Sequence, residues 1–302
     1  MTASARDTGP APLDPAHRED ETLLRVGRIP FLVCAPYFHA SLAGFPSATF
    51  TDGPPRALNK LLASGAIDCA PSSSFEYARH AADYLLLPGL CTSGRGEVKS
   101  VLLFSRVPWD ALEGRPVALS PHSDTSNALV RVLSRFRFAV APVFLPPESG
   151  AVTGEIAGRV AIGDAALREA ATGDWPYRYD LARVWQEWQG TPLPLGVWIL
   201  RADAARARTA VVAEYARHLR DSLRAFFADP QACLDAWERA YGLPLNRADA
   251  LDFFSTADYA LTAAHERALS SFFGLCAELG LLDRAPDLRW FGQPTPDVPV
   301  PG

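Results

Sequence analysis

Ser123-Asp124-Thr125-Ser126 follows a short apolar run at 116–119 and opens a helical pattern that extends to about residue 136. Hydroxyl side chains and free backbone N–H groups at a helix start are suited to holding an anion. A single residue is enough to cap a helix, at a gain of about 1 kcal/mol. Because this segment has polar residues at every position, two interpretations stay open: a capped helix start, and a site for a carboxylate or phosphate.

Comparable polar segments follow other apolar, strand-like runs. They are Pro71-Ser72-Ser73-Ser74-Phe75-Glu76-Tyr77, Glu97-Val98-Lys99-Ser100-Val101 and Ile162-Gly163-Asp164-Ala165-Ala166-Leu167. Ser73 is interpreted as an N-cap or a ligand group, and Ser100 as a loop serine or a site residue. Asp164 is interpreted as an N-cap, a hinge cap or a general base.

Strands and helices alternate along most of the chain, which predicts an α/β fold with mainly parallel sheets and right-handed crossovers. A strand is predicted over 25–34. Ligands of such folds bind at the carboxyl ends of the strands, where the polar segments lie. From residue 201 the pattern becomes helical, and one long amphipathic helix is predicted over 204–227.

The strand-like runs at 101–104 and 195–200 are the natural crossings between two lobes. We therefore predict lobe one over 23–106 and 195–285, with lobe two inserted over 107–194. Paired crossings of this kind allow two lobes to close on a ligand between them. Residues 1–22 are predicted to form a disordered tail and 286–302 a Pro-rich tail.

Composition excludes several functional classes. The net charge of −5 argues against nucleic-acid binding, which requires a basic face. The five cysteines show no C-x-x-C spacing and the histidines no ligand spacing, so neither disulfides nor a metal site is predicted. The phosphate-loop pattern fails because Val98 precedes Lys99. We find no signal peptide and no apolar run that would span a membrane, and predict a cytoplasmic protein.

These segments, in this order, resemble the chorismate dehydratases of the futalosine route to menaquinone. The resemblance extends from about residue 25 to residue 282. It is carried by Arg28-Ile29-Pro30-Phe31-Leu32, Leu58-Asn59-Lys60-Leu61-Leu62, Gly65-Ala66-Ile67-Asp68, Ser72 to Tyr77, Leu87-Pro88, Val98 to Val101, Ser123 to Ser126, Ile162 to Leu167, Asp180-Leu181-Ala182-Arg183-Val184-Trp185, Pro192-Leu193-Pro194 and Val197-Trp198.

The resemblance implies a two-lobed fold of the periplasmic-binding-protein type II class, used as an enzyme. It implies loss of water from chorismate to give 3-(1-carboxyvinyloxy)benzoate, with no cofactor. Ser100 matches the active-site serine of the family. Ser123, Thr125 and Ser126 match its carboxylate-binding helix start, and Ser73 and Asp164 are expected to bind substrate with them.

One position departs from the family pattern. The first motif of the family has an asparagine where this chain has Val33, within Phe31-Leu32-Val33-Cys34-Ala35-Pro36. Valine donates no hydrogen bond, and loss of one oriented donor typically costs about 10²–10³ in rate.

Two alternative functions therefore stay open. One is a non-catalytic binding protein for an aromatic or enolpyruvyl carboxylate, and the other is the related dihydroxynaphthoate synthase of the same route. The expected partner in each case is a small carboxylate, and the oligomeric state is left open.

Overall fold

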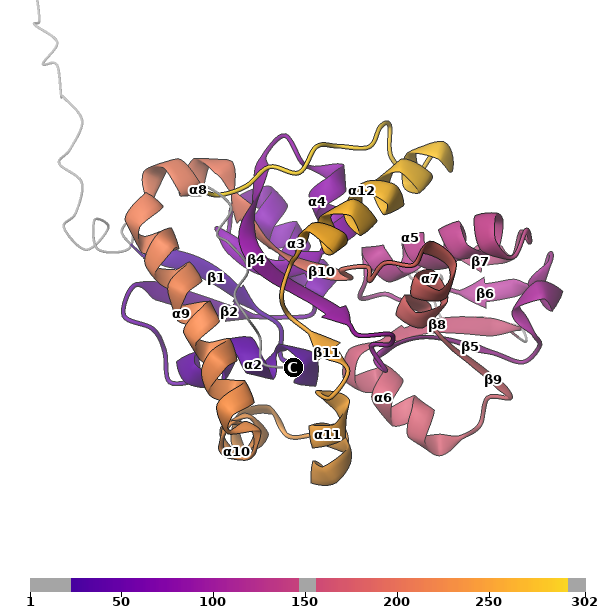
Figure 1. Cartoon of the computed structure of the whole chain (residues 1–302), viewed down its shortest axis with the longest axis horizontal. Helices are drawn as coiled ribbons and strands as arrows, with labels where there is room; N and C mark the ends of the chain where they lie inside the picture. Colours follow the sequence, from indigo (N-terminus) through magenta and orange to yellow (C-terminus); the bar gives the residue numbers. More distant parts are fainter. Residues whose placement is uncertain (1–22, 147–155, 293–302) are drawn as a thin grey trace, which may run out of the picture.

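The computed structural model describes residues 23–146 and 156–292, which form two lobes side by side, each built on its own sheet (Figure 1). This agrees with the predicted two-lobed α/β class. The predicted tail at 1–22 lies outside the described residues.

The first lobe contains a six-stranded sheet in the order β11-β4-β10-β3-β1-β2. The strands are β1 (Leu24–Arg28), β2 (Ala48–Asp52), β3 (Cys69–Ser73), β4 (Tyr84–Gly94), β10 (Gly196–Arg201) and β11 (Ala257–Asp258). Its helices are η1 (Leu32–Cys34), α2 (Ala35–Phe38), η2 (His39–Ser41), α3 (Pro55–Ser64), α4 (Ser74–Arg79), α8 (Ala202–Ala207), α9 (Thr209–Ala228), α10 (Pro230–Tyr241), α11 (Arg247–Phe253) and α12 (Ala263–Glu278).

The second lobe contains a five-stranded sheet in the order β7-β6-β8-β5-β9. The strands are β5 (Val101–Ser105), β6 (Pro116–Ala118), β7 (Val143–Leu145), β8 (Gly158–Ile162) and β9 (Tyr177–Asp180). Its helices are η3 (Trp109–Leu112), α5 (Asp124–Val132), continued as a π-helical segment η4 (Leu133–Arg137), α6 (Gly163–Thr172) and α7 (Leu181–Gln189).

The strand pairing is mixed, which corrects the expectation of mainly parallel sheets. β1 pairs parallel with β2 and β3, whereas β10 is antiparallel to both β3 and β4. In the second sheet β5 is antiparallel to β8 and β9. β5 and β10 each follow a crossing between the lobes and run antiparallel to their neighbours. The βαβ pattern, which joins parallel strands of one sheet, does not describe them.

The lobe crossings lie just before the two strands that were predicted to form them. β5 belongs to the second sheet, although it was predicted in lobe one, and β10 belongs to the first. The chain therefore passes between lobes at 95–100, after β4, and at 190–195, after α7 (Figure 1).

Two further sequence predictions need correction. The strand predicted over 25–34 ends at Arg28, because Pro30 cannot continue a ladder and the chain turns into η1. The long helix predicted over 204–227 is divided at Arg208 into α8 and α9. In the predicted Pro-rich tail, Phe291 donates a 2.9 Å backbone hydrogen bond to Leu86, and 293–302 lie outside the described residues.

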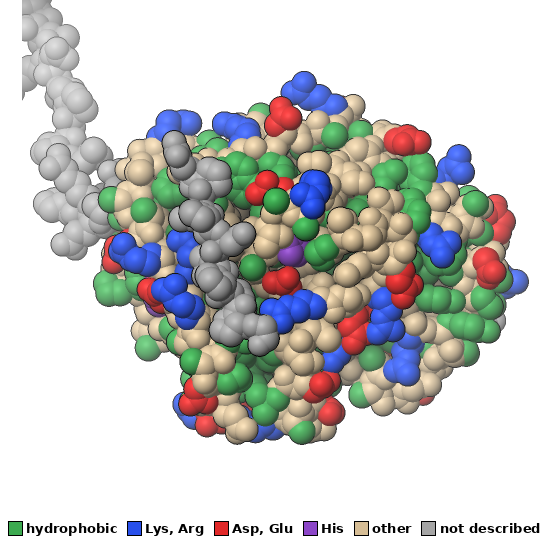
Figure 2. All heavy atoms as spheres, viewed as in Figure 1, with side chains coloured by type: hydrophobic (Ala, Val, Ile, Leu, Met, Phe, Trp, Pro, Cys, Tyr) green, Lys and Arg blue, Asp and Glu red, His purple; other side chains and the backbone are tan. Residues whose placement is uncertain are grey.

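A buried aromatic cluster in the first lobe packs α2 against β10 and the segment that follows β11. The Tyr37 ring centroid lies 5.3 Å from those of both Trp198 on β10 and Tyr259 after β11. Edge-to-face pairs of this kind are worth about 0.5–1.5 kcal/mol beyond the area that they bury. Basic and acidic side chains are interspersed on the surface shown in Figure 2, and the described residues form no continuous basic patch on this face.

Candidate functional site

A cavity of about 100 Å³ lies between the two lobes. Residues of both lobes line it, among them Val33, Ser73, Ser100, Ser123, Gly163 and Phe253. The structure thus brings together four of the predicted site residues, which are Val33, Ser73, Ser100 and Ser123. Thr125, Ser126 and Asp164 do not line the cavity, although each lies within three positions of the lining residues Ser123 or Gly163 in the sequence.

Val33 lies in the short helix η1, which Tyr259 and Asp164 hold in place. The Tyr259 hydroxyl donates a 2.7 Å hydrogen bond to the Val33 carbonyl. The Leu32 N–H donates a 2.9 Å bond to Asp164 Oδ1 in the other lobe. Val33 therefore lines the cavity on a backbone segment that both lobes hold in place.

Ser73 is the N-cap of α4 and is already hydrogen bonded. Its hydroxyl accepts from the Glu76 N–H at 3.3 Å and from Asn59 Nδ2 at 3.5 Å. The neighbouring Ser72 hydroxyl donates to Asn59 Oδ1 at 2.7 Å. Asn59 on α3 thus orients both serines at the cavity wall.

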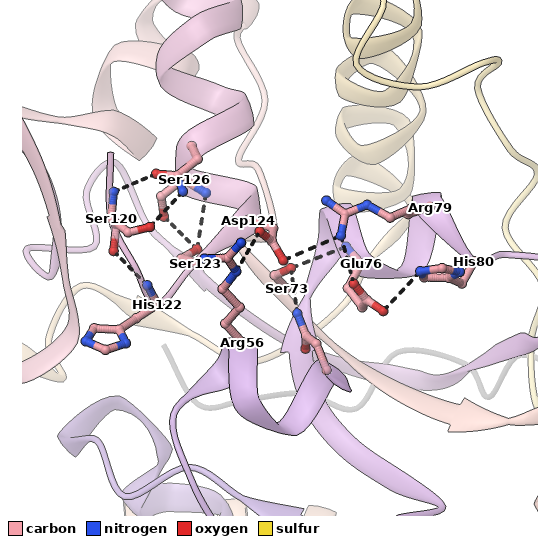
Figure 3. Close-up of polar contacts among 12 residues, drawn as sticks. Arg56, Ser73, Glu76, Arg79, His80, Ser120, His122, Ser123, Asp124 and Ser126 are labelled. Atoms are coloured by element: carbon pink, nitrogen blue, oxygen red, sulfur yellow. Dashed lines mark hydrogen bonds and ion pairs between the residues drawn. The ribbon is translucent and has the colours of Figure 1, made fainter. Parts of the chain in front are cut away.

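Ser123 caps α5 at the cavity, in the first of the segments singled out from the sequence. Its hydroxyl accepts from the Ser126 N–H at 3.2 Å and shares a 2.9 Å hydrogen bond with the Ser126 hydroxyl (Figure 3). The N–H groups of Asp124 and Thr125, in the first turn, have no acceptor within their own helix. Capping and anion binding are therefore compatible here, because the cap uses only part of the helix start.

Thr125 joins the two lobes. Its side chain is fully buried, and its hydroxyl accepts a 3.0 Å hydrogen bond from the N–H of Phe75 on α4. The expectation that it binds substrate therefore meets a competing role, since this oxygen already holds the start of α5 against α4.

Asp164 also joins the lobes. Its bond to Leu32 runs from α6 to η1, and burial raises the pKa of this carboxyl, against the opposing effects of that hydrogen bond and of Arg168. The preceding Gly163 has φ of 61°, and a Cβ there would lie 2.8 Å from the Phe31 ring. The close approach of α6 to η1 thus requires glycine.

Ser100 lies on the crossing at 95–100 and is 4% exposed. Its N–H donates to the Val98 carbonyl at 2.7 Å, and its carbonyl accepts from Gly163 at 2.8 Å. Its hydroxyl makes no hydrogen bond to another residue within the described ranges. A hydroxyl in a cavity wall that has no protein partner is suited to a ligand.

A charged cluster that the sequence did not reveal spans the lobes beside this site (Figure 3). Asp124 on α5 lies 3.8 Å from both Arg56 on α3 and Arg79 on α4, and Arg79 lies 3.5 Å from Glu76. Burial raises the pKa of Glu76 to about 7; Arg79 opposes this shift and Asp124 adds to it. Glu76 and Asp124 belong to polar segments that were singled out from the sequence. No sequence pattern indicated that Arg56 and Arg79 lie beside them.

The cavity therefore combines apolar walls with hydroxyls and helix starts. α5 and α6 both begin at it, and their N-terminal dipoles favour negative charge there. Within the described ranges no group of three or more His, Cys, Asp or Glu side chains is placed to hold a metal ion. In the same ranges no helix is long and apolar enough to cross a membrane.

Comparisons with known proteins give a family and a fold. Residues 24–278 match the family described as menaquinone biosynthesis. A chorismate dehydratase of Thermus thermophilus is 29% identical over 165 residues, which span 49% of this chain and 60% of that protein.

Solved structures of similar fold include binding proteins. A structural-genomics protein from Archaeoglobus fulgidus has a TM-score of 0.69 at 20% identity, covering 86% of this chain and 99% of that one. An alkanesulfonate-binding protein from Xanthomonas axonopodis has a TM-score of 0.61 at 20% identity, covering 86% of this chain and 94% of that one. At these identities the likeness concerns the fold.

Proposed function

The chain belongs to the menaquinone biosynthesis family, and from this premise we propose that it is a chorismate dehydratase. The observation that carries the proposal is the position of Ser100 and Ser123 in one cavity between the lobes. The likeness to the chorismate dehydratase of Thermus thermophilus supports it, over the 60% of that protein's length that the match spans.

The proposed reaction removes a proton from the ring carbon that bears the enolpyruvyl ether, and hydroxide from the neighbouring carbon. The two leave together as water and the ring becomes aromatic, which drives the reaction toward 3-(1-carboxyvinyloxy)benzoate. In this proposal the base is the side-chain carboxylate of the substrate itself, which passes the proton on to the departing hydroxide so that water is formed. The protein then has to bind, orient and desolvate the substrate.

Each part of the cavity has a task in this scheme. One substrate carboxylate binds at the start of α5, where Ser123 and the free N–H groups of the first turn meet it. The Ser100 hydroxyl hydrogen bonds the reacting face, because it has no other partner among the described residues. Phe31 and Phe253 cover the ring and exclude water.

The cytoplasm is the proposed location. All five cysteines are free thiols and buried, which agrees with a reducing compartment.

A non-catalytic carboxylate-binding protein is the second candidate, and Val33 favours it. The cavity has an apolar side chain where the resembled family has an amide donor. Sulfonate-binding proteins are among the solved structures of similar fold, which supports this candidate.

The test is incubation of the purified chain with chorismate, with products identified by mass. Formation of 3-(1-carboxyvinyloxy)benzoate supports the dehydratase. Intact chorismate that nevertheless binds in calorimetry favours the binding protein, and turnover of the futalosine-derived substrate instead favours the dihydroxynaphthoate synthase. Ser123→Ala removes a hydroxyl from the proposed carboxylate site and should weaken chorismate binding, and Ser270→Ala on the exposed face of α12 is its matched control.

A further inference from the structure

We propose that Asp180 is a positioning residue for Ser100 and acts through the turn at 97–100. The proposal rests on the proposed function, since it assigns Ser100 a place in the reaction. Asp180 ends β9, where it pairs with Leu102 of β5, and its side chain reaches the turn that precedes β5.

The Asp180 carboxylate accepts four backbone hydrogen bonds from two separate segments. Oδ2 accepts from Val98 at 3.0 Å and from Lys99 at 2.6 Å. Oδ1 accepts from the N–H groups of Ala182 at 3.0 Å and of Arg183 at 3.1 Å, and through these two bonds Asp180 caps α7. One side chain that is 9% exposed therefore joins the crossing to a helix start.

The turn that Asp180 holds has an unfavourable backbone conformation. Lys99 has φ of 58°, a region that non-glycine residues adopt only where the surroundings enforce it. The Asp180 bonds to two successive N–H groups provide that support from one side. On the other side Gly163 bonds the Ser100 carbonyl, so Ser100 is fixed between two anchors.

A carboxylate is required at this position, and an amide does not replace it. Both carboxylate oxygens accept, whereas an asparagine has one accepting oxygen and an NH₂ that donates. An asparagine that caps α7 would turn its NH₂ toward the N–H groups of Val98 and Lys99. A serine caps a helix about as well as aspartate, but its hydroxyl is too short to serve both segments.

The experiment compares Asp180→Asn and Asp180→Ser with Asp229→Asn. Asp229 caps α10 by accepting a 3.1 Å hydrogen bond from the Ala232 N–H, is exposed, and does not line the cavity. We expect the Asp180 variants to remain folded and to lose about tenfold or more in kcat, while KM changes less than threefold. Amide hydrogen exchange at Val98 and Lys99 should accelerate, and Asp229→Asn should change neither kcat nor this exchange.

Unchanged kcat in folded Asp180→Ser, or exchange at Val98 and Lys99 equal to that of the wild type, would overturn the proposal. If the wild-type chain does not convert chorismate, the proposed function fails by itself, and the exchange measurement still decides whether Asp180 orders the turn. Should Asp180→Asn not fold, Asp180→Ser carries the test because it keeps the α7 cap.

Discussion

The Thr125 hydroxyl accepts a 3.0 Å hydrogen bond from the Phe75 N–H, which ties the start of α5 in one lobe to the start of α4 in the other. We predict that Thr125→Val lowers the free energy of unfolding by about 1–3 kcal/mol, because the buried Phe75 N–H loses its acceptor. We also expect a tenfold loss in kcat/KM, because the Thr125 bond holds the two lobes together around the cavity. A loss of about 1.4 kcal/mol in the free energy that favours this arrangement corresponds to that factor.

Urea unfolding of the ligand-free variant distinguishes this from substrate binding. Thr172→Val, at an exposed site on α6, is the control. A normal stability of ligand-free Thr125→Val together with a raised KM would show that Thr125 binds substrate instead.

Asp164 is predicted to act as a link between lobes and not as a base. Asp164→Asn keeps the Oδ1 acceptor for the Leu32 N–H, so its kcat should stay within about fivefold of wild type. Asp164→Ala removes the acceptor and should lower both stability and kcat/KM. Steady-state kinetics with chorismate check both variants, and a loss of 10³ or more in Asp164→Asn, of about the size that removal of a catalytic base produces, contradicts the assignment.

Glu76 should make stability decrease as pH rises. Its pKa is raised by burial from 4.5 to about 7, so the folded state holds a proton that the unfolded state has lost over this range. The favourable contribution of Glu76 to the free energy of unfolding is fully present below pH 4.5 and is lost as pH rises through 7. Between these values wild type should lose about 1–3 kcal/mol relative to Glu76→Gln.

Urea unfolding at pH 4.5 and 7.5 measures this difference, with Glu238→Gln on the exposed face of α10 as control. Parallel pH dependence of wild type and Glu76→Gln would show that Glu76 does not titrate over this range in the folded protein.

Val33→Asn should raise kcat by about 10–100-fold. An oriented amide donor at a reacting centre typically raises the rate by about 10²–10³, and an asparagine introduced at this half-buried position is expected to recover part of that effect. Val33→Leu, which adds no donor, should not. Kinetics with chorismate test the pair, and equal kcat for the two variants would mean that this part of the cavity wall does not contact the reacting atoms.

The polar segments at the helix starts were predictable because helix capping follows local rules. Capping at Ser73 and Ser123 depends on residues three positions away. The inter-lobe contacts were not predictable, because Thr125 and Phe75 lie 50 positions apart, and Asp164 and Leu32 lie 132 apart. A sequence pattern identifies a helix start but not which distant N–H its side chain meets.

The role of Asp180 illustrates the same limit. Its position before a helical pattern indicates an N-cap, which the structure has, but the second pair of bonds to Val98 and Lys99 depends on β9 lying beside β5. The antiparallel strands β5 and β10 were missed as such because strand direction follows from the path of the chain between lobes.

The conversion of chorismate by the purified chain, compared with that by Ser100→Ala, tests the central claim most directly. We predict that wild type forms 3-(1-carboxyvinyloxy)benzoate and water, and that Ser100→Ala, folded to the same extent, is slower by about 10²-fold or more. Chorismate that stays intact with the wild-type chain, or equal rates for the two proteins, would contradict the account.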